Sequence, residues 1–185
     1  MLFRSTFAAP LGVILDQRAL GSLPRSQIAE GLAEAYKTGL VADPELARLS
    51  HDELAAMLGG DLPLLASAAW RSARAKAEVV GEDFREKGRR RILNHGAAYG
   101  HALESHNHYR ISHGQAVAAG MMVMARVSQG RGLIPAELAD DICATSAGLI
   151  RQKLAWPEAT RSKTTYMVMT LVSEAGGMRR SASWL

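Results

Sequence analysis

Cysteine, aromatic residues and long apolar runs are all scarce in this sequence of 185 residues. Its one cysteine, Cys143, excludes an internal disulfide and indicates a reducing compartment. Aromatic residues make up only 5% of the chain, whereas alanine and methionine are plentiful, and this balance favours packed helices over a β-sandwich. The apolar run AVAAGMMVMA at 116–125 is too short to cross a bilayer as a helix. The amino terminus lacks the pattern of a signal peptide, so we expect a cytoplasmic protein without a membrane partner.

The charge is modestly positive, with a formal net charge of +4 and an isoelectric point of about 9.5. The basic residues form small groups, such as 87–91 and 179–180, and no aromatic side chains lie between them to stack on bases. We therefore expect no nucleic-acid partner. The charge is interpreted as a solvated basic face or as a site for an anionic substrate.

The apolar spacing predicts a mainly α protein. Helices are expected over 27–41, 44–58, 61–80, 89–107, 113–131 and 136–150. The β-branched run GVILD at 12–16 predicts one short strand, and the periodicity fades near the carboxyl end. We divide the chain into a connecting segment with the strand at 1–20, a helical domain at 21–154, and a diverged or poorly ordered tail at 155–185.

Five of the six histidines fall between residues 95 and 113. On a helix from 89 to 107, steps of three, four and seven residues place polar groups on one face. These groups are Arg90, Asn94, His101, Glu104 and His108, with Ala97 among them. His113 follows at the next helix start, where backbone N–H groups favour an anion. Such a stripe fits a binding site or the wet side of an amphipathic helix, and spacing alone favours the wet side.

A glutamate and two lysines form a second candidate group. Glu34 and Lys37 lie three residues apart on one helix face, and a carboxylate of this kind can ligate a cation. A surface ion pair worth roughly 0.3 kcal/mol explains the same spacing. Lys76 lies among apolar helical residues, where it contacts an anion or lays its stem along apolar surface.

Four motifs follow one another along the chain: GLAEAYKTG at 31–39, KAEVVGEDFRE at 76–86, RRILNHGAAYGHALE at 90–104 and HGQAVAAGM at 113–121. Together they resemble the C-terminal, mostly helical domain of 3-dehydroquinate synthase, the second enzyme of the shikimate pathway. Four ordered motifs are far more specific than a single HG or GxxG. The resemblance covers the chain from about residue 5 to residue 135 and implies the helical metal- and substrate-binding fold of that domain.

The resemblance implies a lyase that converts 3-deoxy-D-arabino-heptulosonate 7-phosphate, a phosphorylated C7 sugar acid, into 3-dehydroquinate and phosphate on the route to chorismate and the aromatic amino acids. Members of the family bind NAD and a divalent metal, Zn²⁺ or Co²⁺, and are usually homodimers. By their places in the motifs, Glu34 and His113 resemble metal ligands. The residues that resemble substrate-contacting or catalytic residues are Lys37, Lys76, Arg90, Asn94 and His101.

Two departures from the family pattern bear on activity. Ala97 stands where the family has a metal-binding histidine, so two of the usual three protein ligands remain. His95 would point to another side of a regular helix, whereas His101 lies one turn after Ala97 on the same face and is placed to approach the metal instead. Near the carboxyl end, the Met-Thr-Leu tripeptide at 169–171 replaces a D-K-K that contacts the substrate phosphate.

The sequence also contains no GxGxxG loop after a strand. We therefore expect the nucleotide-binding α/β half, and with it the NAD site, to be absent from this chain, and little turnover by the chain alone. Two alternatives stay open. One is another sugar-phosphate cyclase, making an inosose or a valiolone; the other is a non-catalytic helical module that binds a partner such as a separate nucleotide-binding chain.

Overall fold

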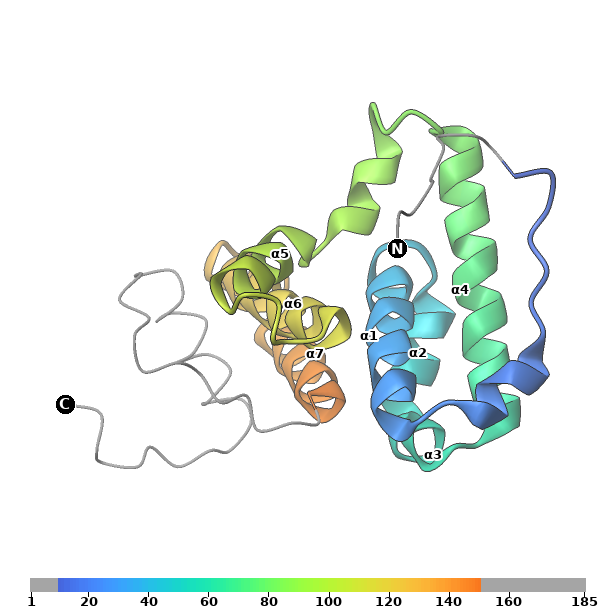
Figure 1. Ribbon diagram of the computed structural model, residues 1–185. Helices are drawn as coiled ribbons and strands as arrows, with labels where there is room; N and C mark the ends of the chain where they lie inside the picture. The colour runs from blue at the N-terminus through green and yellow to red at the C-terminus, as the bar shows by residue number, and fades with distance from the viewer. Residues whose placement is uncertain (1–9, 151–185) are drawn as a thin grey trace.

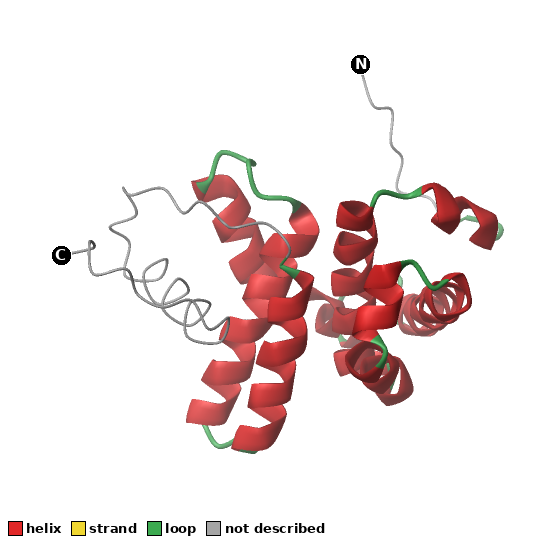
Figure 2. Ribbon diagram, turned by 90° about the horizontal axis from the view of Figure 1, so that it is seen from below, coloured by secondary structure: helices red, strands yellow, loops and turns green. Residues whose placement is uncertain are grey.

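A computed structural model describes residues 10–150 of the protein. Every regular element in this range is a helix, and the range contains no strand (Figure 2). The α-helices are α1 Arg25–Ala42, α2 Pro44–Asp52, α3 Leu54–Gly59, α4 Leu62–Glu82, α5 Ala97–His106, α6 His113–Gly130 and α7 Ala136–Leu149 (Figure 1). Two short 3₁₀ helices, η1 Gln17–Ser22 and η2 Arg89–Asn94, precede α1 and α5. The predicted mainly α fold is confirmed.

The helices form two groups that meet where α1 packs against α6 (Figure 1). In one group, α2, α3 and α4 pack around α1; in the other, α5 and α7 pack on α6. The core runs along α6, where Val117, Met121 and Met122 are fully buried. The apolar run at 116–125 is therefore the central core helix, and the α1–α6 contact lies between the two groups.

Capping residues set the helix starts in the first group. Asp43 accepts hydrogen bonds from the first backbone N–H groups of α2, with Pro44 at the first helical position, and Asp61 does the same for α4. Gly60 ends α3 in the left-handed conformation, with a φ of 94°. These local signals explain why the helix starts at 44 and near 61 were predicted correctly. The single helix predicted over 44–58 is wrong, because the chain breaks at Glu53 into α2 and α3.

The strand predicted at 12–16 is wrong. A strand needs a neighbour to pair its N–H and C=O groups, and none of the residues from 10 to 150 supplies one. Val13 and Ile14 are instead 74% and 96% exposed. The segment leads irregularly into η1, which Asp16 caps by accepting a hydrogen bond from the Arg18 backbone N–H.

The single helix predicted over 89–107 is also wrong. Its first part is the 3₁₀ helix η2, and α5 starts only at Ala97. Between them, Gly96 has a φ of 72°, a left-handed conformation that interrupts a regular helix. A Cβ at Gly96 would also come within 2.9 Å of the Met121 backbone nitrogen on α6. Both the turn and the close packing therefore require glycine at this position.

The loop before η2 holds that helix in place. The Asp83 carboxylate accepts hydrogen bonds from the backbone N–H groups of Gly88, Lys87 and Arg90, at 2.7, 2.9 and 3.1 Å. These bonds, the one from Gly88 most of all, hold the pKa of Asp83 below its usual value. Together with the turn at Gly96, this loop takes η2 out of line with α5, so the predicted shared face from Arg90 to His101 does not form.

The predicted tail at 155–185, including the tripeptide at 169–171, lies outside the described residues. So do the first nine residues of the connecting segment. None of the described helices is both long enough and apolar enough to span a membrane.

Candidate functional site

α6 begins directly against α1 because a glycine leaves no side chain at their crossing. A Cβ on Gly114 would overlap the Cα of Glu30, so a larger residue does not fit without a shift of one helix. His113, the first residue of α6, is therefore held beside α1. Glu34 lies one turn after Glu30 on the same face of α1 and meets the imidazole of His113 there.

α5 approaches α6 in a similar way. A Cβ on Gly100 would come within 3.1 Å of the Ala116 carbonyl oxygen, so the backbones of the two helices are close at this pair. His101 and Glu104, three residues apart on α5, both lie next to His113 as a result. Two glycine crossings thus bring side chains from α1, α5 and α6 to one place.

His113 lies between two carboxylates. Its Nε2 is 3.3 Å from Glu34 Oε1, and its Nδ1 is 2.9 Å from Glu104 Oε1. The ring of His101 stacks beside that of His113, with the ring centroids 5.8 Å apart and the planes at 28°. The prediction that the Glu34 carboxylate and imidazoles from distant helices lie together is confirmed.

Two lysines bind the Glu34 carboxylate. Lys37 Nζ donates to Oε1 at 2.8 Å, and Lys76 Nζ, which comes from α4, donates to Oε2 at 3.3 Å. Burial alone would raise the pKa of Glu34, but the hydrogen bond and charge of Lys37, joined by Lys76, outweigh it and lower the pKa. Glu34 is therefore an ionised carboxylate whose charge the two ammonium groups compensate.

The donors around His113 suit a divalent cation of the zinc type. His101, Glu104 and His113 each offer one ligand atom, and these three atoms all lie within 4.8 Å of one another. Imidazole nitrogens and carboxylate oxygens are the donors that Zn²⁺ takes in catalytic sites. The methyl group of Ala97, where the resemblance predicts a metal-binding histidine, offers no donor.

The structure does not bring Arg90 and Asn94 to this cluster. An η nitrogen of Arg90 donates to the Phe84 carbonyl at 2.8 Å, and Asn94 Nδ2 donates to Glu86 Oε1 at 2.6 Å. Among the described residues, neither side chain hydrogen-bonds a member of the cluster. Their substrate-contacting roles stay predictions, as do the roles of the residues that converge.

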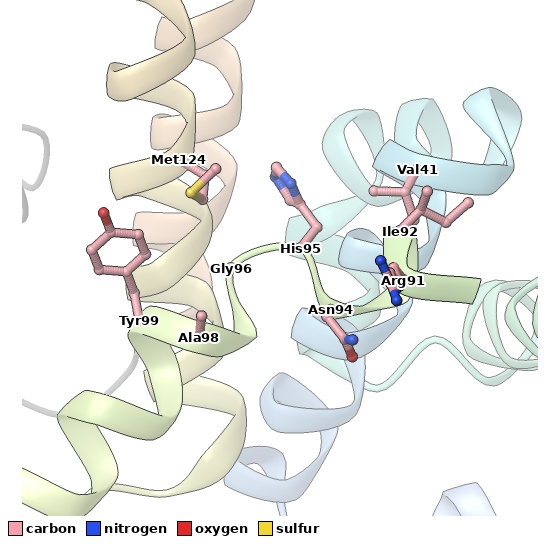
Figure 3. A pocket seen from close by; sticks show the side chains of 9 residues that line it. All are labelled: Val41, Arg91, Ile92, Asn94, His95, Gly96, Ala98, Tyr99 and Met124. Carbon is pink, nitrogen blue, oxygen red and sulfur yellow. The ribbon is translucent and has the colours of Figure 1, made fainter. Parts of the chain in front are cut away.

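A cleft of about 470 Å³ lies between η2, α5 and α6 (Figure 3). His95 and Asn94 point to opposite sides of the segment that joins η2 to α5, and His95 lies between Val41 and Met124 (Figure 3). Burial, and to a smaller extent the charge of Lys37, lowers the pKa of His95. His95 thus lines the cleft and is not one of the residues whose ligand atoms gather at His113.

Sequence reasoning placed Glu104 on a face with His101 but assigned it no role. The structure makes it the most enclosed member of the imidazole side of the cluster, with only 13% of its side chain exposed. The available signal was its spacing of three from His101 directly after Gly100, a small residue at a helix crossing.

The fold and the cluster define an all-helical domain in which a helix crossing gathers carboxylates, imidazoles and ammonium groups. Residues 31–170 match the family model described as 3-dehydroquinate synthase C-terminal. The chain therefore belongs to the 3-dehydroquinate synthase C-terminal domain family.

Similar proteins include 3-dehydroquinate synthases of known sequence. The synthase of Corynebacterium glutamicum (strain R) is 44% identical over 137 residues, which cover 71% of this chain and 37% of the relative. That of Xanthomonas axonopodis pv. citri (strain 306) is 41% identical over 133 residues, or 69% of this chain and 36% of the relative. The chain thus spans little more than a third of the length of these curated relatives.

Among solved structures, the chain is similar to ValA, the 2-epi-5-epi-valiolone synthase of Streptomyces hygroscopicus subsp. jinggangensis 5008, determined with NAD⁺ and Zn²⁺ bound. The TM-score is 0.68 at 19% sequence identity, over 88% of this chain and 45% of that one. At this identity the likeness shows a shared fold.

Proposed function

We propose that the chain supplies the cation- and substrate-binding helical part of a sugar-phosphate cyclase of the 3-dehydroquinate synthase type. The reaction is the conversion of 3-deoxy-D-arabino-heptulosonate 7-phosphate into 3-dehydroquinate and phosphate, in aromatic amino acid biosynthesis. Family membership supports the reaction class. The observation that carries the proposal is the cluster around His113, because four helices bring two imidazoles, two carboxylates and two ammonium groups together there.

The two lysines divide the work of binding an anionic substrate. The side chain of Lys76 is 40% exposed and its contact with Glu34 is long, at 3.3 Å, so its ammonium group is free to turn to a phosphate or carboxylate. Lys37 is only 7% exposed and keeps its 2.8 Å bond to Glu34, which fixes that carboxylate. Lys76 binds the anion, and Lys37 keeps the carboxylate beside it in position.

The imidazole of His101 is open to a bound ligand. Its side chain is exposed, and it makes no hydrogen bond within residues 10–150, so its ring nitrogens are free to meet a substrate hydroxyl or a cation. A divalent cation held by His113 and the donors on its flanks would supply Lewis-acid polarisation of substrate hydroxyl groups, and NAD would supply the hydride acceptor. The site itself provides position and charge.

NAD binding requires protein outside the described residues. The described helices contain no parallel sheet, on which dinucleotide-binding folds depend. The relatives are nearly three times as long as the matched region, so they have ample length for another domain. We infer that a nucleotide-binding domain or chain partners this one.

Phosphate release tests the proposal. The full chain is mixed with a separately produced N-terminal part of the Corynebacterium glutamicum synthase, the heptulosonate phosphate, NAD and Zn²⁺. The chain alone should release little phosphate, and the mixture should release it steadily. Lys76→Met should slow release by about tenfold or more because it removes the charge that positions the anion, whereas Lys87→Met, on an exposed loop, should not.

Product analysis by NMR separates 3-dehydroquinate from the products of other cyclases, and a different cyclitol would contradict the substrate assignment. A folded chain that co-purifies with the N-terminal part but yields no phosphate would contradict the catalytic proposal and favour the partner-binding module.

A further inference from the structure

Both ring nitrogens of His113 face a carboxylate oxygen. Nε2 lies 3.3 Å from Glu34 Oε1, and Nδ1 lies 2.9 Å from Glu104 Oε1. A metal-bound imidazole uses one nitrogen for the cation and donates the N–H of the other to an acceptor such as a carboxylate. The position of His113 therefore allows a cation on one side and a supporting carboxylate on the other.

The two sides of His113 differ in how much positive charge they already have. Glu34 has the ammonium groups of Lys37 and Lys76 on its two oxygens. Glu104 is 87% covered by protein, and within residues 10–150 no lysine or arginine pairs with it. A covered carboxylate without a cationic partner is costly, so the unmet need for a cation lies on the Glu104 side.

That side also has the full donor set. His101, Glu104 and His113 provide two imidazole nitrogens and a carboxylate oxygen within 4.8 Å of one another. Among residues 10–150, the Glu34 side offers Glu34 and His113, and Ala97 adds no donor. A catalytic zinc takes three protein ligands and keeps one position open.

We propose that this chain holds a divalent cation of the zinc type through His101, Glu104 and Nδ1 of His113, and that Glu34 is a positioning residue that accepts the Nε2–H of His113. The motif resemblance predicts a cation on the Glu34 side of the His113 imidazole, whereas this proposal places the cation on the Glu104 side. Carboxylates that accept the second N–H of a metal-bound histidine fix its tautomer and orientation, which is the part Glu34 takes here. Lys37, buried at 2.8 Å from Glu34, holds that carboxylate in place.

Zinc titration of the untagged, metal-free full chain by calorimetry tests this assignment. One zinc per chain should bind. Glu104→Gln and His101→Gln should each weaken binding by about 100-fold or more, since each removes one ligand of three. Glu34→Gln should weaken it by less than about tenfold, because the glutamine oxygen still accepts the N–H of His113. His106→Gln, an exposed imidazole at the end of the same helix, is the matched control and should bind like the wild type.

Ala97→His supplies a donor at the family position and tests the same assignment in reverse. In this background the zinc affinity should become sensitive to Glu34→Gln and lose most of its sensitivity to Glu104→Gln. Circular dichroism of each metal-free variant confirms that it is folded before its zinc affinity is compared.

Three results would overturn the assignment. Loss of zinc binding in Glu34→Gln with retention in Glu104→Gln would place the cation on the Glu34 side. Equal losses in both would place it between the two carboxylates. No zinc uptake by the wild type would show that the three donors do not form a cation site. Zinc uptake needs neither substrate nor NAD, so its outcome is separate from that of the phosphate-release experiment.

Discussion

On each of its two flanks, His113 faces a glutamate carboxylate, but the two carboxylates differ in the positive charge around them. On one flank, Glu34 accepts hydrogen bonds from Lys37 and Lys76 at 2.8 and 3.3 Å. Burial would raise the pKa of Glu34, but these two lysines outweigh burial and lower it. On the other, Glu104 is more enclosed, at 13% against 27% side-chain exposure, yet within residues 10–150 no lysine or arginine pairs with it.

The comparison teaches that position in a motif does not settle the role of a carboxylate. The Glu34 flank is already an electrostatically closed network, which stabilises the fold and orients an imidazole. The Glu104 flank is a set of three donors with which no lysine or arginine pairs among residues 10–150. One helix crossing builds each flank, so the flanks can be disturbed separately.

Gly114→Ala should have the largest effect, because it pushes α6 away from α1 and breaks the Glu34 flank. The added Cβ overlaps the backbone of Glu30, and overpacking of this kind against main chain costs about 3 kcal/mol. Urea unfolding of the metal-free chain measures the loss.

Gly31→Ala is the control for this substitution. It lies on α1 with nothing within 4 Å of the added Cβ, so it should stabilise the protein by about 0.5–1 kcal/mol through helix propensity. Equal stability of Gly114→Ala and the wild type would show that the α1–α6 crossing does not depend on glycine.

Glu34→Gln should destabilise the metal-free protein by about 2 kcal/mol, because it leaves the ammonium group of Lys37 buried without a carboxylate. Glu104→Gln should cost less than about 0.5 kcal/mol in the same state, since no ammonium group depends on Glu104 among the described residues. A larger loss in Glu104→Gln than in Glu34→Gln would reverse the comparison.

The cost of Glu34→Gln should also depend on pH. The pKa of Glu34 is lowered from its ordinary value of about 4.5, so its ionised form stabilises the fold above that pH, and the contribution is lost as the pH falls through the lowered value. The unfolding free energies of wild type and Glu34→Gln should therefore differ most at neutral pH and converge as the pH falls from about 4.5 through the lowered pKa of Glu34. A constant difference from pH 7 to pH 3 would argue against the ion network.

Gly100→Ala should have the smallest effect on stability, about 1 kcal/mol, because its Cβ would stop 3.1 Å from the Ala116 carbonyl oxygen and a small shift relieves the contact. That shift moves His101 and Glu104 relative to His113, so the zinc affinity should fall while the Glu34 network stays intact. Unchanged zinc affinity would show that the Glu104 flank tolerates such a shift.

The sequence predicted the helices that carry their own start signals and a clear apolar period. The helix at 113–131 and the one at 136–150 were found within two residues of their observed ends. The strand at 12–16 was wrong because a β-branched run indicates a strand only where a neighbour pairs with it. The helix at 89–107 was wrong because the turn at Gly96 depends on contact with α6, which periodicity does not report.

In the candidate site, too, local sequence patterns differ from contacts that form only on packing. The resemblance of ordered motifs selected Glu34, Lys37, Lys76, His101 and His113, and all five meet in the structure. Spacing alone favoured ordinary surface polarity for each of them, because a cluster drawn from four helices exists only after packing. The Gly100 crossing brings Glu104 to His113, whereas the Asp83 loop holds Arg90 and Asn94 apart from this cluster, and their roles stay predictions.

X-ray absorption at the zinc edge of the loaded full chain tests the central claim most directly, because it counts imidazole ligands. The Glu104 side supplies two imidazoles, from His101 and His113, together with oxygen donors. The account predicts two imidazoles in the wild type and one in His101→Gln at saturating zinc. A single imidazole in the wild type, unchanged by His101→Gln, would contradict it and return the cation to the Glu34 side.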